Sequence, residues 1–348
     1  MNDLLLNPDP ENMLGYIDAL PDDLEKTWQL GHELAQPEYP SIDRMVIAGM
    51  GGSAIGGDLL AAYLSPTGTI PIVSHRNYGL PAWAKGEHTL VVCSSHSGNT
   101  EETLSSFRSA LEQDCSVMVL TTGGKLQALA QENHVPVWIF QHSGQPRTAI
   151  PYSFGLLLAL ACRLGLAVDA EAEVADAVAV MRAARAGLTA STELFANPAK
   201  RLAGQLLNRN IAIFAAGELE VVARRWKTQI NELAKAWASF EGLPESNHNT
   251  LAGLLNPECL YEQTSAIFLR ADMDIPRNAL RLDATQGAFL QAGIATDTIH
   301  AGAGSRLAQI WSLLQFGDYL SYYLALLYQV DPTPVDALTA LKKRLAQN

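Results

Sequence analysis

Cysteine, aromatic residues and basic charge are all scarce in this sequence of 348 residues. The four cysteines lie far apart and form no CxxC pair, which argues against a thiolate metal site and against a disulfide framework. Lysine and arginine total 24 against 36 aspartates and glutamates, which gives a net charge of −12. Because binding to a phosphate backbone needs a basic surface, we expect no nucleic-acid partner.

Signals for export and for membrane insertion are also missing. The N-terminus, Met1-Asn2-Asp3-Leu4, lacks the basic and apolar segments of a signal peptide. The longest apolar stretch, Phe154–Ala161, is too short to cross a bilayer. We therefore expect a cytoplasmic protein without a membrane partner.

The sequence does contain a regular alternation of strand-like and helix-like runs, which predicts an α/β fold with parallel sheets. The expected strands are Met45–Ala48, Ile70–Ser74, Thr89–Ser94, Ser116–Thr121 and Val135–Ile139, then Asn210–Ala216, Thr264–Arg270 and Thr296–Ile299. The expected helices include Ala54–Leu64, Glu101–Gln113, Leu219–Trp237, Ala279–Gln291, Arg306–Tyr328 and Pro334–Leu345. Since the second half repeats the first, we predict two tandem, flavodoxin-like αβα sandwich domains. They would comprise residues 1–165 and 199–348, joined by a connecting helix over residues 166–198.

Two turns in the first half are rich in glycine and hydroxyl residues. Gly49–Ser53 and Ser94–Thr100 each follow a strand-like run and open a helix-like run. Glycine lets the backbone approach a ligand, hydroxyls donate hydrogen bonds, and a helix N-terminus attracts anions. Two such turns in successive units predict a phosphate site. The residues expected to bind the phosphate are Gly52, Ser53, Ser95, Ser97 and Thr100.

The turns at the corresponding places of the second half carry carboxylates. They are Gly217-Glu218 and Ala271–Asp274. Carboxylates repel phosphate, so we expect a duplicated chain in which only the first copy binds an anion.

Two other interpretations of the first-half turns stay open. Serine and threonine are favoured helix caps, so both turns can be explained by capping alone. Gly49-x-Gly51-x-x-Ala54 also matches a dinucleotide fingerprint, although the next strand leads to His75 and Arg76 where an acidic residue is needed. Arg76 would suit NADP, but this interpretation leaves the second turn unexplained, and we expect no cofactor.

The two turns, together with Arg225–Glu232 and Pro244–Asn249, resemble the bifunctional phosphoglucose/phosphomannose isomerase family over nearly the whole chain. This family is a branch of the sugar isomerase (SIS) domain proteins. The Ser-x-Ser-Gly-Asn-Thr turn is shared by SIS proteins in general, and the Asn-Glu and Asn-His-Asn segments point to this branch. Position 96 is histidine where family members often have an aromatic residue, which should tune the turn.

The resemblance implies two SIS-type domains and an aldose–ketose isomerase. The reaction would interconvert glucose 6-phosphate, and mannose 6-phosphate, with fructose 6-phosphate through a cis-enediol. One carboxylate base is sufficient for the proton transfer, so neither a metal nor a redox cofactor is implied. The histidines show no HxH, HxxxH or HExxH spacing, which argues against a cupin-type, metal-dependent mannose-phosphate isomerase.

The resemblance also implies roles for four residues. Glu232 would be the base, and His248 would move protons during ring opening. Arg147, between two prolines, would stabilise enediolate charge, and Lys342 would contact the substrate. It further implies a homodimer with composite sites, each combining Glu232 of one chain with His248 of the other.

Without the resemblance, plainer interpretations of these residues hold. Glu232 would pair with Lys227 or Lys235 on a solvated helix face. His248 would be a surface histidine in a polar turn, which we expect between two helical runs. Lys342, next to Lys343, would belong to a basic helix end.

Two other functions are compatible with a SIS fold. One is a non-catalytic module that senses a phosphosugar, but the acidic first 40 residues contain no basic recognition helix. The other is a different SIS phosphosugar isomerase, such as the isomerase part of a glucosamine-phosphate synthase. That enzyme needs a nucleophilic N-terminal cysteine, and residue 2 here is asparagine.

Overall fold

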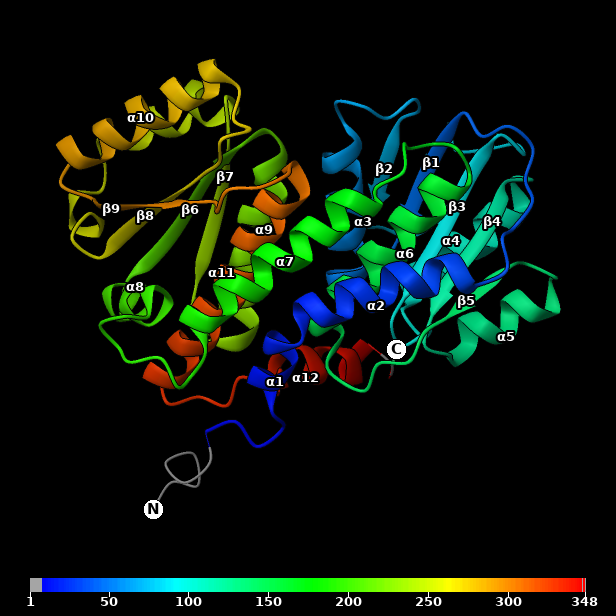
Figure 1. Cartoon of the computed structure of the whole chain (residues 1–348), viewed down its shortest axis with the longest axis horizontal. Coiled ribbons are helices and arrows are strands. Elements are labelled where there is room, and N and C mark those ends of the chain that lie inside the picture. The colour runs from blue at the N-terminus through cyan, green and yellow to red at the C-terminus, as the bar shows by residue number, and fades with distance from the viewer. Residues whose placement is uncertain (1–7, 346, 348) are drawn as a thin grey trace. The chain divides into compact units, whose positions relative to one another are not determined.

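The computed structural model describes residues 8–345 and 347 (Figure 1). Its internal contacts divide the chain into two compact units, which we describe one at a time. The first-sheet unit comprises Ala19–Arg182 and Ala303–Trp311. The second-sheet unit comprises the chain up to Asp18, Ala183–Gly302 and the chain from Ser312 onward. The domain boundaries expected after residues 165 and 198 stay a prediction.

The first-sheet unit contains five parallel strands in the order β2-β1-β3-β4-β5. The strands are β1 (Arg44–Ala48), β2 (Ile72–His75), β3 (Thr89–Ser95), β4 (Ser116–Thr121) and β5 (Val137–Ile139). The chain crosses from β1 to β2 on one side, then returns to β3 on the other side of β1 and continues outward. The neighbours β1 and β3 therefore flank the point at which the strand order reverses. Ligands of open α/β sheets bind at the carboxyl ends of such a pair.

Helices cover both faces of this sheet. On one face, α4 (Glu101–Glu112) and α5 (Gly124–Glu132) pack Phe107 and Leu126 against Val91 and Val119. On the other face lies α3 (Gly51–Leu64), where Gly57 meets Ile47 of β1, with α6 (Ile150–Arg163) and α2 (Leu20–Glu33) packed in the same layer. β1, β3 and β4 are apolar on both faces because each face is covered.

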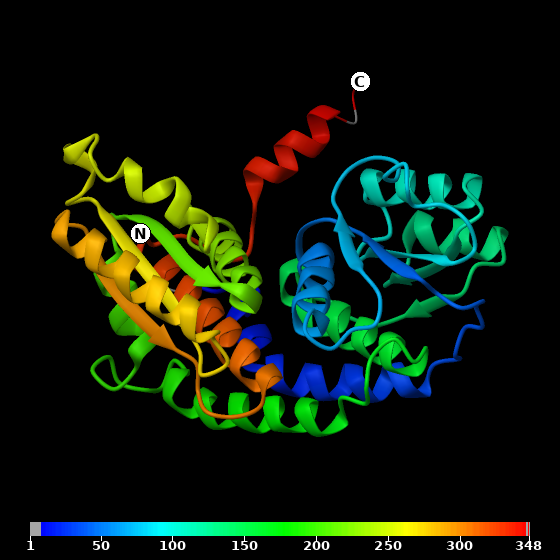
Figure 2. The same ribbon diagram turned by 90° about the horizontal axis from the view of Figure 1, so that it is seen from above.

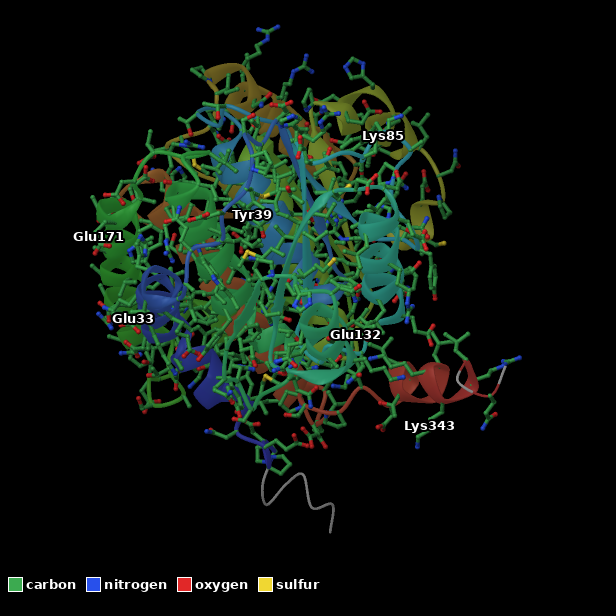
Figure 3. The ribbon with its side chains drawn as sticks, turned by 90° about the vertical axis from the view of Figure 1, so that its right-hand side faces the viewer. Glu33, Tyr39, Lys85, Glu132, Glu171 and Lys343 are labelled. Atoms are coloured by element: carbon green, nitrogen blue, oxygen red, sulfur yellow. The ribbon has the colours of Figure 1, made fainter. Side chains whose placement is uncertain are left out.

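The segment before β1 is also fixed to this unit. Tyr39, labelled in Figure 3, donates its hydroxyl hydrogen to the carbonyl of Val117 on β4 at 2.9 Å. The indole of Trp28 on α2 donates to the carboxylate of Glu171, the first residue of α7 (Glu171–Leu188). These two bonds hold the segment before β1 and α2 to the rest of this unit.

The second-sheet unit contains four parallel strands in the order β7-β6-β8-β9. They are β6 (Asn210–Ala216), β7 (Ala238–Leu243), β8 (Thr264–Arg270) and β9 (Ala295–His300). This order repeats that of the first four strands of the other sheet. Figure 2 shows α10 (Pro276–Gln291) along one face, where Phe289 packs on Phe214 and Phe268. On the opposite face, Arg224 of α9 (Glu220–Leu233) lies 5.1 Å from the ring of Phe240.

The remaining helices complete the two units. They are α1 (Met13–Asp18), α8 (Pro198–Leu206), α11 (Arg306–Leu327) and α12 (Asp336–Leu345), and the 3₁₀ helices η2 (Pro146–Thr148), η3 (Gly217–Leu219), η4 (Glu245–His248), η5 (Thr250–Gly253) and η6 (Glu258–Leu260). Arg225 of α9 and Asp318 of α11 form a fully buried ion pair, 2.8 Å between Nη2 and Oδ2. Among the described residues, no helix is both long enough and apolar enough to span a membrane.

The predicted fold class, α/β with two parallel sheets, is confirmed. Every strand expected from the sequence is present within a few residues. One strand, Ala238–Leu243, was not predicted. It pairs only with β6, so it lies at the edge of the sheet, and its middle four residues are half-exposed. The turn with His248 therefore follows a strand, and the prediction that it lies between two helical runs is wrong.

Candidate functional site

The two hydroxyl-rich turns lie side by side at the carboxyl ends of β1 and β3. The last paired residues of these strands are Ala48 and Cys93. A Cβ atom added to Gly49 would lie 2.8 Å from the carbonyl oxygen of Ser94, so the two backbones touch and only glycine fits there. Gly51 has a positive φ of 52° with no atom within 4 Å of its added Cβ. The turns thus meet at the position where this fold class binds ligands.

The second turn is held in shape by its own side chains. Ser95 is almost fully buried, and its hydroxyl accepts from the backbone N–H of Gly98 at 3.1 Å and lies 2.9 Å from that of Thr100. Ser97 is exposed, and its hydroxyl accepts from the backbone N–H of Asn99 at 3.2 Å. Ser95 therefore shapes the turn from inside, whereas Ser97 offers its hydroxyl to a ligand.

The N-terminus of α3 is the better anion site of the two helix starts. The first turn of α3 has no acidic residue, whereas α4 begins with Glu101 and Glu102. The positive end of the α4 dipole is thus partly neutralised, and that of α3 is not. Gly52 and Ser53 belong to this first turn of α3, where the backbone N–H of Ser53 donates to the carbonyl of Met50 at 3.1 Å and a first-turn N–H such as that of Gly52 suits a phosphate.

Arg147 lies next to this helix start. A Cβ atom on Gly52 would lie 2.6 Å from the carbonyl oxygen of Pro146 and 3.4 Å from the Cα atom of Arg147. Arg147 is 3% exposed, so its side chain is held within the fold. The structure therefore brings Arg147 together with the predicted phosphate residues in one unit.

A pair of histidines joins the second turn to the segment after β5, and no sequence pattern predicted this contact. His96 Nε2 lies 3.0 Å from Nδ1 of His142, whose Nε2 lies 3.3 Å from the hydroxyl of Thr148. Burial lowers the pKa of His96. Burial, then His96 and Lys26, lower the pKa of His142 to about 4. Both rings are therefore neutral near pH 7. The two residues are 46 positions apart, so only the fold brings them together.

Glu232 and His248 belong to the second-sheet unit and lie at opposite ends of its strands. Glu232 is half-buried in the last turn of α9, next to the amino end of β7, whereas His248 follows the carboxyl end of β7. The ammonium of Lys235 donates to the backbone carbonyl of Glu232 at 2.7 Å.

The turn around His248 is fixed by its neighbours. Asn247 donates to the hydroxyl of Thr285 at 2.7 Å, and Asn249 donates to the carboxylate of Glu245 at 2.9 Å. His248 itself is exposed. Lys342 and Lys343 are both exposed on α12, where Figure 3 shows Lys343 projecting from the helix.

The carboxyl ends of β6 and β8 correspond to those of β1 and β3, but the turns there carry carboxylates instead of hydroxyls. Asp274 accepts from the backbone N–H of Ala271 at 3.1 Å and lies 3.4 Å from Nε of Arg270. Glu218 lies in η3, just after β6, the strand next to β8. Among residues 8–345 and 347, no three His, Cys, Asp or Glu side chains gather closely enough to hold a metal ion.

The guanidinium of Arg76 pairs in a two-pronged manner with Asp58 of α3, at 3.0 Å for the Nη1–Oδ1 contact. The Asp58 carboxylate accepts from the same guanidinium N–H groups of Arg76 that would have to bind the 2′-phosphate of NADP. This geometry disfavours the dinucleotide interpretation of the first turn.

Comparisons with known proteins identify the family. The chain is 38% identical over 330 residues to the bifunctional phosphoglucose/phosphomannose isomerase of Caldicellulosiruptor bescii, with 94% of this chain and 97% of that protein covered. It is 32% identical over 305 residues to the protein of the same description from Aquifex aeolicus, with 87% and 91% covered. The structure of tagatose-6-phosphate ketose/aldose isomerase from Escherichia coli shares the fold, with a TM-score of 0.68 at 15% identity, over 92% of this chain and 94% of that one.

A family model adds to these matches. Residues 195–345 match the bacterial phospho-glucose isomerase C-terminal SIS domain. That range contains the Asn-Glu and Asn-His-Asn segments of the second-sheet unit. By identity over most of its length and by this domain match, the chain belongs to the bifunctional phosphoglucose/phosphomannose isomerase family.

Proposed function

We propose that this protein is an isomerase that interconverts glucose 6-phosphate, and also mannose 6-phosphate, with fructose 6-phosphate. The observation that carries the proposal is the meeting of two hydroxyl-rich turns at the β1/β3 reversal point, in a chain of this family. Such a site holds a phosphate by backbone N–H groups, hydroxyls and a helix dipole.

The phosphate would be bound by Gly52 and Ser53 at the start of α3 and by Ser97 and Thr100 of the second turn. Ser95 would keep that turn in shape, since its hydroxyl already bonds within it. Phosphate binding of this kind fixes one end of the substrate. Orientation of the reacting carbons then follows from the remaining contacts.

Glu232 would transfer the proton. Its carboxylate removes the proton from C2 of the open-chain aldose, and the C2–H electron pair forms the C1–C2 double bond of a cis-enediolate. A second proton passes from O2 to O1, and the same carboxyl returns the first proton to C1 as the C2 carbonyl forms, so no electron acceptor is needed. The guanidinium of Arg147 would stabilise the negative oxygen of the intermediate. Lys342 would contact the substrate.

His248 would assist ring opening from the partner chain of a homodimer. Glu232 and His248 lie at opposite ends of the strands of one sheet. The six-residue strand β7 separates them. At roughly 3.3 Å per residue, the strand alone spans about 20 Å. This separation supports a site in which a second chain supplies one of the two residues.

The decisive experiment is turnover of glucose 6-phosphate and mannose 6-phosphate with EDTA present and without nucleotide or glutamine. We expect fructose 6-phosphate from both, because the proton transfer needs only a carboxylate. Tight binding of both sugar phosphates without turnover would show a phosphosugar-binding module instead. Activity that EDTA abolishes and added metal restores would contradict the metal-free mechanism. Localisation in the cytoplasm, where these metabolites occur, belongs to the same proposal.

A further inference from the structure

We propose that His142 is a positioning residue that couples the phosphate turn to the Arg147 turn, through His96 on one side and Thr148 on the other. The inference rests on the proposed function, because it concerns the two turns assigned there to the phosphate and to the enediolate. His96 lies between Ser95 and Ser97, and Thr148 follows Arg147 directly. The two hydrogen bonds of His142 therefore join the phosphate turn to the Arg147 turn.

The hydrogen bonds assign the tautomers of both rings. The hydroxyl of Thr148 donates its hydrogen to the carbonyl of Gln145 at 2.8 Å, so it accepts from Nε2–H of His142. Nδ1 of the neutral His142 ring is then an acceptor, and it accepts from Nε2–H of His96 at 3.0 Å. One chain of donors thus runs from the phosphate turn into η2.

The surroundings support a neutral, fixed His142. Its ring meets those of His96 and Tyr152 edge to face, each at 5.2 Å between centroids. Burial and the ammonium of Lys26 disfavour its protonated form. With the hydrogen of His96 on Nε2, a proton on Nδ1 of His142 would place two donors opposite each other, so this arrangement of the chain requires the neutral ring.

The two turns depend on this chain to different degrees. The phosphate turn has strong backbone anchors of its own: the carbonyl of His96 accepts from Thr122 N and Oγ1 at 3.2 and 2.7 Å, and that of Gly98 accepts from Leu126 N at 2.9 Å. The hydroxyl and N–H bonds of Thr148 to Gln145 stay within the Arg147 turn. Loss of the chain should therefore loosen the Arg147 turn and leave phosphate binding intact.

The test uses variants that separate shape from hydrogen bonding. His142→Phe and His96→Phe keep an aromatic ring and remove the bonds, whereas His96→Gln keeps an N–H donor at similar reach and cannot titrate. The exposed His134 of the same unit, with a φ of 55°, gives a control as His134→Asn, since asparagine tolerates that conformation. Each variant is measured for kcat and KM with glucose 6-phosphate. Calorimetry gives the affinity for inorganic phosphate and for 5-phosphoarabinonate, a mimic of the enediolate.

We expect both phenylalanine variants to lower kcat and affinity for 5-phosphoarabinonate by about tenfold, the effect of one lost hydrogen bond. KM and affinity for inorganic phosphate should stay within about twofold. The double phenylalanine variant should be no worse than either single one, because the chain acts as a unit. His96→Gln and the control should resemble the wild type.

Other results overturn the inference. Equal losses of phosphate and 5-phosphoarabinonate affinity, or strictly additive effects in the double variant, would mean that these histidines only support packing. Should His142→Phe fail to fold, the His96→Phe and His96→Gln pair decides the question alone: similar kcat values in those two variants would refute the coupling. Failure of the proposed function is separate, since the wild type itself would then lack isomerase activity.

Discussion

At the scale of single residues, Glu232 is the side chain on which the proposed chemistry depends most. Glu232→Gln preserves size and removes the base, so kcat should fall by several orders of magnitude and exchange of the C2 proton with solvent should stop. Tm and phosphate affinity should be unchanged. NMR of the substrate in D₂O measures the exchange.

Persistent exchange in Glu232→Gln would contradict the assignment. Glu218 and Glu245, which follow β6 and β7 in the same unit, would then be the alternative bases. Their glutamine variants provide the matched comparison.

Ser97 and Thr100 are the residues of the second turn whose side-chain hydroxyls we expect to bind the phosphate. A hydrogen bond to a charged group contributes about 1.5–3 kcal/mol. Ser97→Ala combined with Thr100→Ala should therefore raise KM by tenfold or more, with the fold preserved as judged by circular dichroism. An unchanged KM for sugar phosphate would remove these hydroxyls from the site. Ser95→Ala is the informative contrast, because it should lower stability through the turn's internal bonds.

At the scale of elements, the contact between the start of α3 and η2 leaves no room for a side chain at Gly52. The Cβ of Gly52→Ala would lie 2.6 Å from the carbonyl of Pro146, so one of the two elements must move. We expect a higher KM and a lower kcat together, because the anion site and Arg147 both shift. Gly204→Ala on α8 is the control, since its Cβ meets nothing within 4 Å and alanine favours a helix by about 1 kcal/mol. Wild-type kinetics in Gly52→Ala would show that the contact is soft.

The sequence predicted most elements because their patterns are strong. The buried strands of the first sheet read as continuous apolar runs, and the two turns carry glycine where the backbones touch. β7 was not predicted, because the sequence of this edge strand contains Glu241 and Gly242 and so resembles that of a loop. The His96–His142 contact could not be predicted at all, since it depends on how the segment after β5 returns to the β3 turn. The roles of Glu232, His248 and Lys342 come from family resemblance, and they stay predictions.

At the scale of the whole molecule, His142 should make stability depend on pH. Its pKa is lowered from 6.5 to about 4 in the folded protein. Between these values the unfolded chain binds a proton that the folded chain does not, so stability falls as pH is lowered through this range. The groups that face the ring are His96, Lys26 and Tyr152, whose hydroxyl donates to Asp23 at 3.0 Å.

The measurement is Tm as a function of pH for the wild type and His142→Phe. The variant should lose less Tm than the wild type between about pH 7 and about pH 5, with His134→Asn as the control. Parallel curves for wild type and His142→Phe would show that this imidazole does not resist protonation in the folded state.

The composite site makes a prediction about assembly. Glu232→Gln and His248→Ala should each be inactive as homodimers. After subunit exchange, some mixed dimers would contain one site with both residues intact, so partial activity should return. Mass spectrometry verifies the exchange. If activity does not recover although the subunits have exchanged, both residues act in one chain. A protein that is monomeric at assay concentration would exclude the composite site.

The two sheets share a strand order, yet their reversal points differ in charge. One offers glycine, hydroxyls and an uncompensated helix start, and the other offers Glu218 and Asp274. Duplication of a binding fold ordinarily doubles the number of ligands that a chain can hold. Because carboxylates repel a phosphate, we expect one sugar phosphate per chain rather than two, with the second copy contributing other residues to the reaction.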